Sequence, residues 1–206
     1  MAAWGRADAD DYRRLPLRAH SLLSDIPLHD VWRVTLPGGG PNRTIEDVRS
    51  LVSTTLRGEG LNPGVRSLFA VRERIGHALN WDRPPADFDT DWFRHRLTDE
   101  DRRQSKVEPG TPDGPFQVLY VFDREAAGEV RNATVHAGSV MALERIPNGY
   151  ELFWAIYVQR VGRWTRLYMG AIDPFRRFLV YPSILRRIHR GWIAGYASPA
   201  DRPMRN

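Results

Sequence analysis

The sequence predicts an α+β protein in which one antiparallel sheet carries its helices on a single side. A strand and two helical patterns come first, and residues 116–172 then hold strand patterns that no helix interrupts. A long amphipathic helical pattern follows, whose apolar side needs a partner as large as that sheet. A chain of 206 residues, 42% of them hydrophobic, is long enough for one complete core and short for two.

We therefore expect one domain over residues 28–196, with an N-terminal extension at 1–27 and a C-terminal tail at 197–206. The first strand of this domain covers residues 29–36, and the run from Pro37 to Pro41 ends it. The glycines of this run do not form a phosphate-binding loop, because no lysine follows them at the required spacing. We interpret the run as a flexible connector to the first helix.

Two helices are predicted between the first strand and the others. Thr44 caps the first helix, with Asp47 three residues later in the carboxylate position of a capping box. The second helix covers residues 62–82, where the apolar side chains share one stripe. Residues 83–115 are rich in Pro, Asp and Arg, so we expect a long surface excursion with one short helix near 91–97. The anchors expected in this excursion are Trp92, Phe93 and Leu97.

Further strands are predicted at residues 116–122, 130–146, 150–161 and 164–172, with tight turns at Asn148-Gly149 and Gly162-Arg163. Because side chains alternate along a strand, this pairing sorts them onto two faces. One face is apolar and consists of Met141, Leu143, Leu152, Trp154, Ile156, Val158, Leu167 and Met169. The other face is mixed and carries His136, Glu144, Tyr157, Gln159, Arg166 and Tyr168.

The final helix follows Asp173-Pro174 and is predicted to cover the apolar face of the sheet. Its buried stripe is expected to consist of Phe175, Phe178, Leu179, Leu185, Ile188 and Trp192. The opposite, solvent side is expected to carry Arg176, Ser183, Arg186, Arg187 and Arg190. Pro182 removes one helical hydrogen bond, so we expect either a kink near residues 178–182 or a helix that begins at Pro182.

The basic residues are almost all arginines, since Lys106 is the only lysine in a chain of net charge +5. Residues 164–192 contain six arginines and one acid, and so account for the whole net charge. A basic helix of this kind can meet nucleic acid, an anionic membrane or an acidic partner. We favour a solvated face and expect no nucleic acid, because the basic pattern lacks interleaved exposed aromatic residues.

Several classes of chemistry are excluded or disfavoured. The chain has no cysteine, which rules out disulfides, thiolate catalysis and cysteine-bound metals. Its six histidines show no HExxH or HxH spacing and no GxSxG elbow is present, so we expect no metal, no cofactor and no catalytic residues. His136 with Tyr157 or Tyr168 is an alternative acid–base pair, although we favour a structural histidine. Without an export signal or a membrane-length apolar span, we expect a cytoplasmic protein with no stable membrane insertion.

Three runs of residues, at 62–82, 130–143 and 166–192, resemble the bacterial family called domain of unknown function 2867. The resemblance covers residues 28–193 and is most specific at Tyr168, Ile172, Asp173-Pro174-Phe175 and Tyr181-Pro182. It implies a START-like helix-grip fold, in which a curved antiparallel sheet wraps the C-terminal helix around a cavity for apolar ligands. Arg176 stands where many relatives have histidine. The family has no established catalytic residues, so none is transferred to this chain.

The resemblance and the apolar face together lead us to expect a binding protein for a small apolar molecule, lipid- or polyketide-like, held between the sheet and the final helix. The residues expected to line this cavity are Met141, Leu143, Trp154, Ile156, Leu167, Met169, Phe178, Tyr181 and Leu185. Two alternatives stay open. One is a cyclase- or dehydratase-like enzyme on the same scaffold, and the other is an interaction module whose basic C-terminal helix docks an acidic protein partner.

Overall fold

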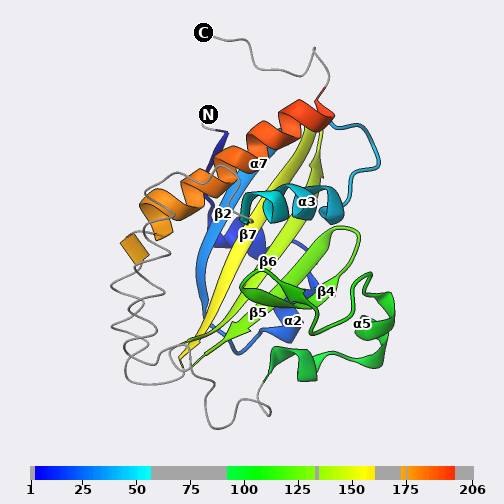
Figure 1. The fold of residues 1–206 in the computed structure, drawn as a ribbon, viewed down its shortest axis with the longest axis vertical. Helices are drawn as coiled ribbons and strands as arrows, with labels where there is room; N and C mark the ends of the chain where they lie inside the picture. The colour runs from blue at the N-terminus through cyan, green and yellow to red at the C-terminus, as the bar shows by residue number, and fades with distance from the viewer. Residues whose placement is uncertain (1–2, 57–91, 133–134, 161–172, 175, 198–206) are drawn as a thin grey trace.

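The computed structural model describes residues 3–56, 92–132, 135–160, 173–174 and 176–197 (Figure 1). The helix predicted at 62–82, the turn at 162–163 and the strand at 164–172 lie outside the described residues. Within them the chain forms one curved sheet of seven strands in the order β1-β2-β7-β6-β5-β4-β3, with every neighbouring pair antiparallel. The predicted α+β class and single antiparallel sheet are therefore confirmed.

The strands and helices follow each other along the chain in a simple order. The strands are β1 (Trp4–Arg6), β2 (Leu28–Pro37), β3 (Pro112–Asp113), β4 (Phe116–Val121), β5 (Glu125–Arg131), β6 (Val135–Ile146) and β7 (Gly149–Arg160). The helical elements are α1 (Ala9–Arg13), α2 (Arg18–Leu22), α3 (Ile45–Leu56), the 3-10 turn η1 (Phe93–Arg96), α5 (Asp99–Gln104), the π-helical turn η2 (Arg176–Val180) and α7 (Tyr181–Tyr196). None of the described helices combines the length and the apolar composition that crossing a bilayer requires.

At the start of α3 the carboxylate half of the predicted capping box is confirmed, because the Asp47 carboxylate accepts a hydrogen bond of 2.9 Å from the Thr44 amide. In contrast, the prediction of one strand over 130–146 is wrong. Asn132 turns the chain there: its amide donates to the Val135 carbonyl at 2.9 Å, and its side-chain oxygen accepts from the Val135 amide at 3.0 Å. The strand before this turn, β5, has the sequence EAAGEVR, which is poor in the β-branched and aromatic residues that mark strands.

The turn between β6 and β7 consists of Pro147 and Asn148, one residue earlier than predicted, because Ile146 pairs with Gly149. Gly149 has a φ of +143°, and a Cβ atom there would lie 2.3 Å from the Leu36 carbonyl oxygen, so only glycine fits. The assignment of side chains to faces still holds. Met141 lies opposite Trp154 and Leu143 opposite Leu152, as the alternating pattern predicts.

Helices α3 and α7 lie side by side over one face of the sheet (Figure 1). The buried side chains of α7 that pack on this face are Tyr181, Ile184, Leu185, Ile188 and Trp192. The Trp192 indole also donates to the Pro37 carbonyl at 3.0 Å, and His189 Nδ1 donates to the Thr35 carbonyl at 2.8 Å. These contacts confirm that the final helix covers the predicted apolar face.

Helix α7 begins at Tyr181 and has Pro182 in its first turn. This start lies one residue before Pro182, where one of the two predicted alternatives began the helix. The π-helical turn η2 precedes it. A π-helical turn changes the angular position of the side chains it carries relative to the α-helix that follows. The prediction that Phe178 and Leu179 belong to the buried stripe is therefore wrong, and these side chains are 79% and 45% exposed.

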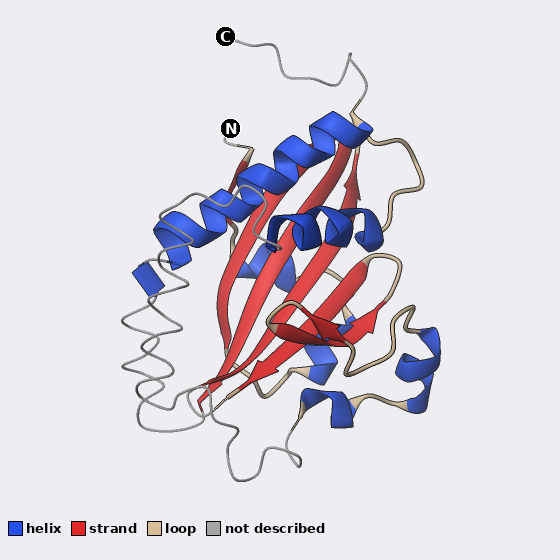
Figure 2. Cartoon of the chain, in the orientation of Figure 1, coloured by secondary structure: helices blue, strands red, loops and turns tan. Residues whose placement is uncertain are grey.

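The prediction that the helices gather on one side is also wrong, because the N-terminal helices lie behind the sheet in Figure 2 and the second face carries a core of its own. The N-terminal segment supplies Tyr12, Leu22 and Leu23 to this core, and the 92–104 segment supplies Phe93 and Leu97. They pack on the apolar middle of the sheet, where the side chains are Val140, Ala142, Phe153, Ala155 and Tyr157. The anchors predicted in the surface excursion, Trp92, Phe93 and Leu97, are indeed buried.

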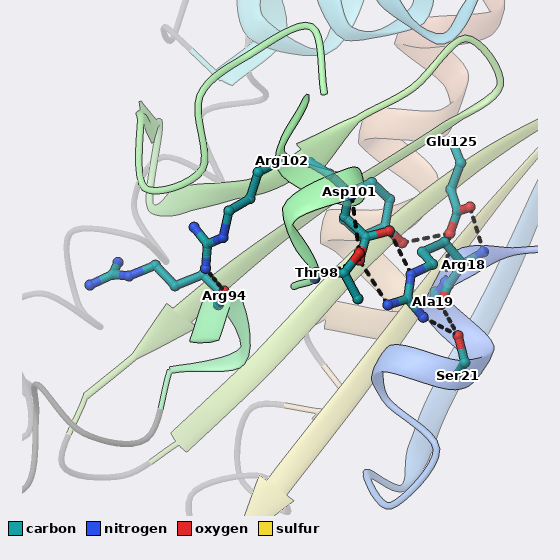
Figure 3. Close-up of polar contacts among 9 residues, drawn as sticks. Arg18, Ala19, Ser21, Arg94, Thr98, Asp101, Arg102 and Glu125 are labelled. Atoms are coloured by element: carbon teal, nitrogen blue, oxygen red, sulfur yellow. Dashed lines mark hydrogen bonds and ion pairs between the residues drawn. The ribbon is translucent and has the colours of Figure 1, made fainter. Parts of the chain in front are cut away.

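Two buried glutamates of β5 hold these covering segments in place. Glu125 accepts hydrogen bonds from the amides of Arg18 and Ala19, at 2.8 and 2.9 Å, and from the Tyr120 hydroxyl at 2.6 Å (Figure 3). Glu129 accepts from the amides of Phe93 and Arg94, at 2.7 and 3.2 Å. Each carboxylate thus accepts hydrogen bonds from backbone amides at the start of a short helical turn. These hydrogen bonds explain how two glutamates can be buried in β5, a strand in the interior of the sheet.

Candidate functional site

A partly open pocket of about 60 Å³ lies on the same face of the sheet as α7, but beneath α3 rather than beneath α7. Its floor comes from β4, β5, β6 and β7, and its side from α3 and the residues around β3. The lining residues are Arg49, Val52, Ser53, Asp113, Phe116, Val118, Val121, Ala126, Ala127, Gly128, Ser139, Met141 and Trp154. Most of these side chains are apolar, so the pocket is suited to an apolar group.

Four polar side chains, those of Arg49, Ser53, Asp113 and Ser139, interrupt this apolar lining. Trp154 Nε1 donates to the Ser139 hydroxyl oxygen at 2.8 Å, which pairs the indole with the neighbouring strand. On the α3 side, Arg49 Nη2 lies 2.8 Å from Asp113 Oδ2. The Arg49 side chain is only 19% exposed, whereas that of Asp113 is 40% exposed. The guanidinium therefore borders the pocket from a half-buried position.

The structure separates the residues predicted to line a cavity into distinct groups. Met141 and Trp154 do line the pocket. Leu143, Ile156, Tyr181 and Leu185 are buried in the core that joins the sheet to α7, outside the pocket lining. Phe178 is exposed on η2, and Leu167 and Met169 lie outside the described residues.

An aromatic cluster fills the space where the sheet meets the start of α7. The Tyr181 ring centroid lies 4.9 Å from that of Trp32 and 5.4 Å from that of Trp154. Burial raises the pKa of Tyr181 to about 12, so its hydroxyl is neutral near pH 7 and accepts a hydrogen bond from Arg176. This packing links the pocket-lining Trp154 directly to Tyr181 at the start of α7.

Beside these rings, residues far apart in the sequence form a charged cluster. His29 Nε2 lies 3.0 Å from the Asp173 carboxylate and 3.5 Å from Asp30 Oδ2. The ligand-type atoms of the three residues lie within 4.8 Å of one another, so their geometry resembles that of a metal-ligand set. The Asp30 side chain is fully buried, which makes its charge costly unless it is compensated.

Arginines supply that compensation. Arg6 Nη2 is 3.1 Å and Arg177 Nη2 is 3.5 Å from Asp30 Oδ1, and Arg176 Nη1 is 3.5 Å from Asp173. Because these guanidinium groups provide positive charge where a cation would sit, we interpret the cluster as an ion-pair clamp that joins β1, β2 and η2. The expectation that Arg176 projects to the solvent side is wrong, since its side chain is 20% exposed and paired.

His136, the alternative general base, lies on the opposite face of the sheet from the pocket. Its Nε2 donates to Glu129 at 3.1 Å, and its ring stacks on Phe93 at a centroid distance of 3.7 Å. Tyr157 donates to the Tyr12 hydroxyl at 3.3 Å, and burial raises the pKa of Tyr157. Neither His136 nor Tyr157 lines the described pocket, so their contacts fit the structural interpretation.

Sequence reasoning missed Arg49, Asp113, Phe116 and Ser139 as pocket residues. Alternation along β6 places Ser139 on the same face as Met141, so this position was within reach of a sequence pattern. Arg49 and Asp113 are 64 positions apart, and no local pattern connects them. Ala126 and Gly128 belong to β5, the strand whose sequence lacks strand signals.

The described part of the chain defines an α+β protein whose single antiparallel sheet packs against a long C-terminal helix and holds a small apolar pocket beside it. The chain belongs to the family described as protein of unknown function (DUF2867), whose model matches residues 22–183. The family resemblance is thereby confirmed. Neither a search of curated proteins nor a search of solved structures found a match.

Proposed function

We propose that this protein binds the apolar part of a small lipid- or polyketide-like molecule, and that its fold is of the START-like helix-grip kind. A strand followed by a helix, then antiparallel strands and a long C-terminal helix across the sheet, supports that fold. The observation that carries the function is the apolar pocket next to α3, with Met141 and Trp154 in its lining.

The size of the described pocket limits what enters it. An apolar cavity of about 150 Å³ accepts benzene, and the pocket here has about 60 Å³. A branched end of an aliphatic chain therefore fits, while a fused aromatic ring system exceeds the described volume. Because the pocket is only partly enclosed, the remainder of such a ligand extends out of it.

Binding is favoured over catalysis by the polar groups that line the pocket. Among the described lining residues, the titratable side chains are Arg49 and Asp113, and these two pair with each other. General acid–base chemistry needs a proton donor or acceptor within hydrogen-bond reach of the substrate and poised near the working pH. Arg49 and Asp113 are engaged with each other in an ion pair, so neither is free for this role in the empty pocket, and the cyclase- or dehydratase-like alternative has less support.

A pair of matched substitutions tests the pocket. Ala126 lines it, whereas Ala137 lies on the same face and outside the lining, and both are buried. Ala126→Leu fills the pocket and is expected to abolish the rise in Tm that short branched aliphatic acids and alcohols produce in the wild type by mass action. Ala137→Leu imposes a similar overpacking and should keep that rise. Persistence of the rise in Ala126→Leu contradicts the proposal.

If Ala126→Leu does not fold, a second substitution provides the same information. Met141→Ala enlarges the pocket at a partly buried position. The variant should shift the preferred ligand towards a longer or bulkier chain, because apolar pockets rank ligands mainly by size. An unchanged chain-length preference contradicts the assignment of Met141 to the ligand site. Tm measurements with a graded series of alcohols read out this preference.

The exposed surface of η2 and α7 supports a second candidate function, docking of an acidic protein partner. Phe178 and Leu179 are exposed next to a helix whose Arg186 and Arg190 are also exposed, and α7 contains no acidic residue. Apolar side chains beside unbalanced positive charge suit an acidic peptide with apolar residues. An acidic peptide that contains Phe and Leu should bind the wild type and lose affinity for Phe178→Ala. Equal affinity of both proteins counts against this candidate.

A further inference from the structure

Arg49 is positioned to recognise a charged group on the α3 side of the pocket. It belongs to α3, lines the pocket, and donates a hydrogen bond of 2.8 Å to Asp113. A guanidinium has five N–H donors, and among the described residues Arg49 uses only the one that Asp113 accepts. The remaining donors are free to hold an anionic group of a ligand.

Ser139 offers a second hydrogen-bond donor to the same pocket. Its oxygen accepts from Trp154 Nε1 at 2.8 Å, and within the described part of the chain its own proton has no acceptor. The serine is buried and lies in the pocket lining. A buried hydroxyl that keeps an unused donor favours a ligand with an acceptor atom over a purely apolar one.

The charges of Arg49 and Asp113 distinguish between kinds of ligand head group. Arg49 disfavours a cation, and Asp113 beside it disfavours a doubly charged anion such as phosphate. A carboxylate carries one charge, and its two oxygens match the fork of a guanidinium. Asp113 is the more exposed partner of Arg49, so it can turn towards solvent when another carboxylate arrives.

We propose that the ligand is a branched- or short-chain aliphatic carboxylic acid, whose chain fills the apolar pocket and whose carboxylate pairs with Arg49. This inference rests on the proposed function and adds the head group to it. Arg49 is then the residue that determines specificity, since the apolar lining distinguishes ligands mainly by size. Asp113 acts as an internal competitor that keeps the guanidinium paired while the pocket is empty.

Isothermal titration with sodium isovalerate and isovaleramide tests the inference, because these probes share one branched chain and differ in charge. The wild type should bind isovalerate about 10- to 100-fold more tightly than isovaleramide, the difference that a charge-assisted pair provides. Arg49→Met should bind both probes alike, with unchanged affinity for the amide. Arg190→Met, which removes an exposed arginine of α7, should behave as the wild type.

Asp113→Asn provides a readout that a purely structural role of Arg49 would not produce. Removal of the competing charge should tighten isovalerate binding and leave isovaleramide binding unchanged. Equal affinities of the wild type for the two probes, or an acid preference that persists in Arg49→Met, overturns the inference.

Ala126→Leu distinguishes the two levels of the proposal. If both probes bind the wild type equally and Ala126→Leu binds neither, the pocket is the binding site and only the carboxylate inference fails. If neither probe binds the wild type, the inference and the proposed function fail together. Binding that survives in Ala126→Leu locates the ligand elsewhere and also rejects both.

Discussion

Arg18 and Asp101 form a bidentate ion pair, in which Arg18 Nε and Nη2 donate to the two carboxylate oxygens of Asp101 at 2.8 Å each (Figure 3). Asp101 also completes the capping box of α5 by accepting from the Thr98 amide at 2.9 Å. The pair joins α2 to α5 across 83 positions of the chain. Two segments that the sequence leaves outside the predicted sheet are thus fastened to each other over its second face.

The first prediction concerns the pH dependence of this ion pair. The hydrogen bonds from Arg18 lower the pKa of Asp101 from 3.8 to about 2. The unfolded state therefore binds a proton before the folded state does, so the pair stabilises the protein above about pH 4 and loses this effect as the pH falls towards 2. The contribution is expected to be about 1–2 kcal/mol.

Urea unfolding of the wild type and Asp101→Asn between pH 6 and pH 2 measures the contribution of the ion pair to the unfolding free energy. The difference in unfolding free energy between the two proteins should shrink as the pH falls through this window. Asp99→Asn, an exposed acid in the same helix, is the control and should show a smaller pH-dependent difference. A difference for Asp101→Asn that stays constant with pH contradicts the assigned role of the ion pair.

The second prediction compares a packed core residue with a pocket residue. Leu185 is fully buried between α7 and the sheet, so Leu185→Ala should cost about 2–5 kcal/mol of unfolding free energy by leaving a cavity. Met141 lines an existing pocket and is partly buried, so Met141→Ala should cost less than about 2 kcal/mol. Equal losses in chemical denaturation would show that Met141 is packed as tightly as Leu185.

The third prediction separates the arginines of the clamp from those of the helix surface. Arg177→Gln removes one of the charges that compensate the buried Asp30, and should cost more than about 1 kcal/mol. Arg186→Gln and Arg190→Gln alter exposed side chains and should each change stability by less than about 0.5 kcal/mol. Thermal unfolding at one ionic strength compares the variants, and a null effect of Arg177→Gln would refute the clamp.

The fourth prediction addresses the attachment of the N-terminal segment. Glu125→Ala leaves the amides of Arg18 and Ala19 and the Tyr120 hydroxyl without their shared acceptor, at a cost of about 3 kcal/mol. Hydrogen exchange should show lost protection of these two amides. Glu144→Ala, at a half-buried position whose nearest basic partner is 4.0 Å away, is the control. Unchanged protection in Glu125→Ala would mean that other contacts hold α2.

Some of the candidate site could be predicted from the sequence. Alternation along β6 and β7 correctly placed Met141 and Trp154 on the face that α7 covers. The turn was predicted one residue too late, but this error does not change which side chains of the two strands share a face. The Arg49–Asp113 pair could not be predicted, since it depends on how α3 and β3 approach each other. The exposure of Phe178 was missed because a π-helical turn leaves no mark in an α-helical periodicity.

By itself, the sequence determined the α+β class, the two faces of the β6–β7 hairpin, the start of α3 and the packing of α7, all of which follow from local periodicity and turn residues. Only the tertiary structure decided that the sheet has a second core and that Glu125 and Glu129 lie in a central strand. The tertiary structure alone also brought His29, Asp30 and Asp173 together. The physical reason is that the partners of these groups come from distant parts of the chain: the second core needs apolar side chains from separate segments, and a buried charge is stable only with its partners.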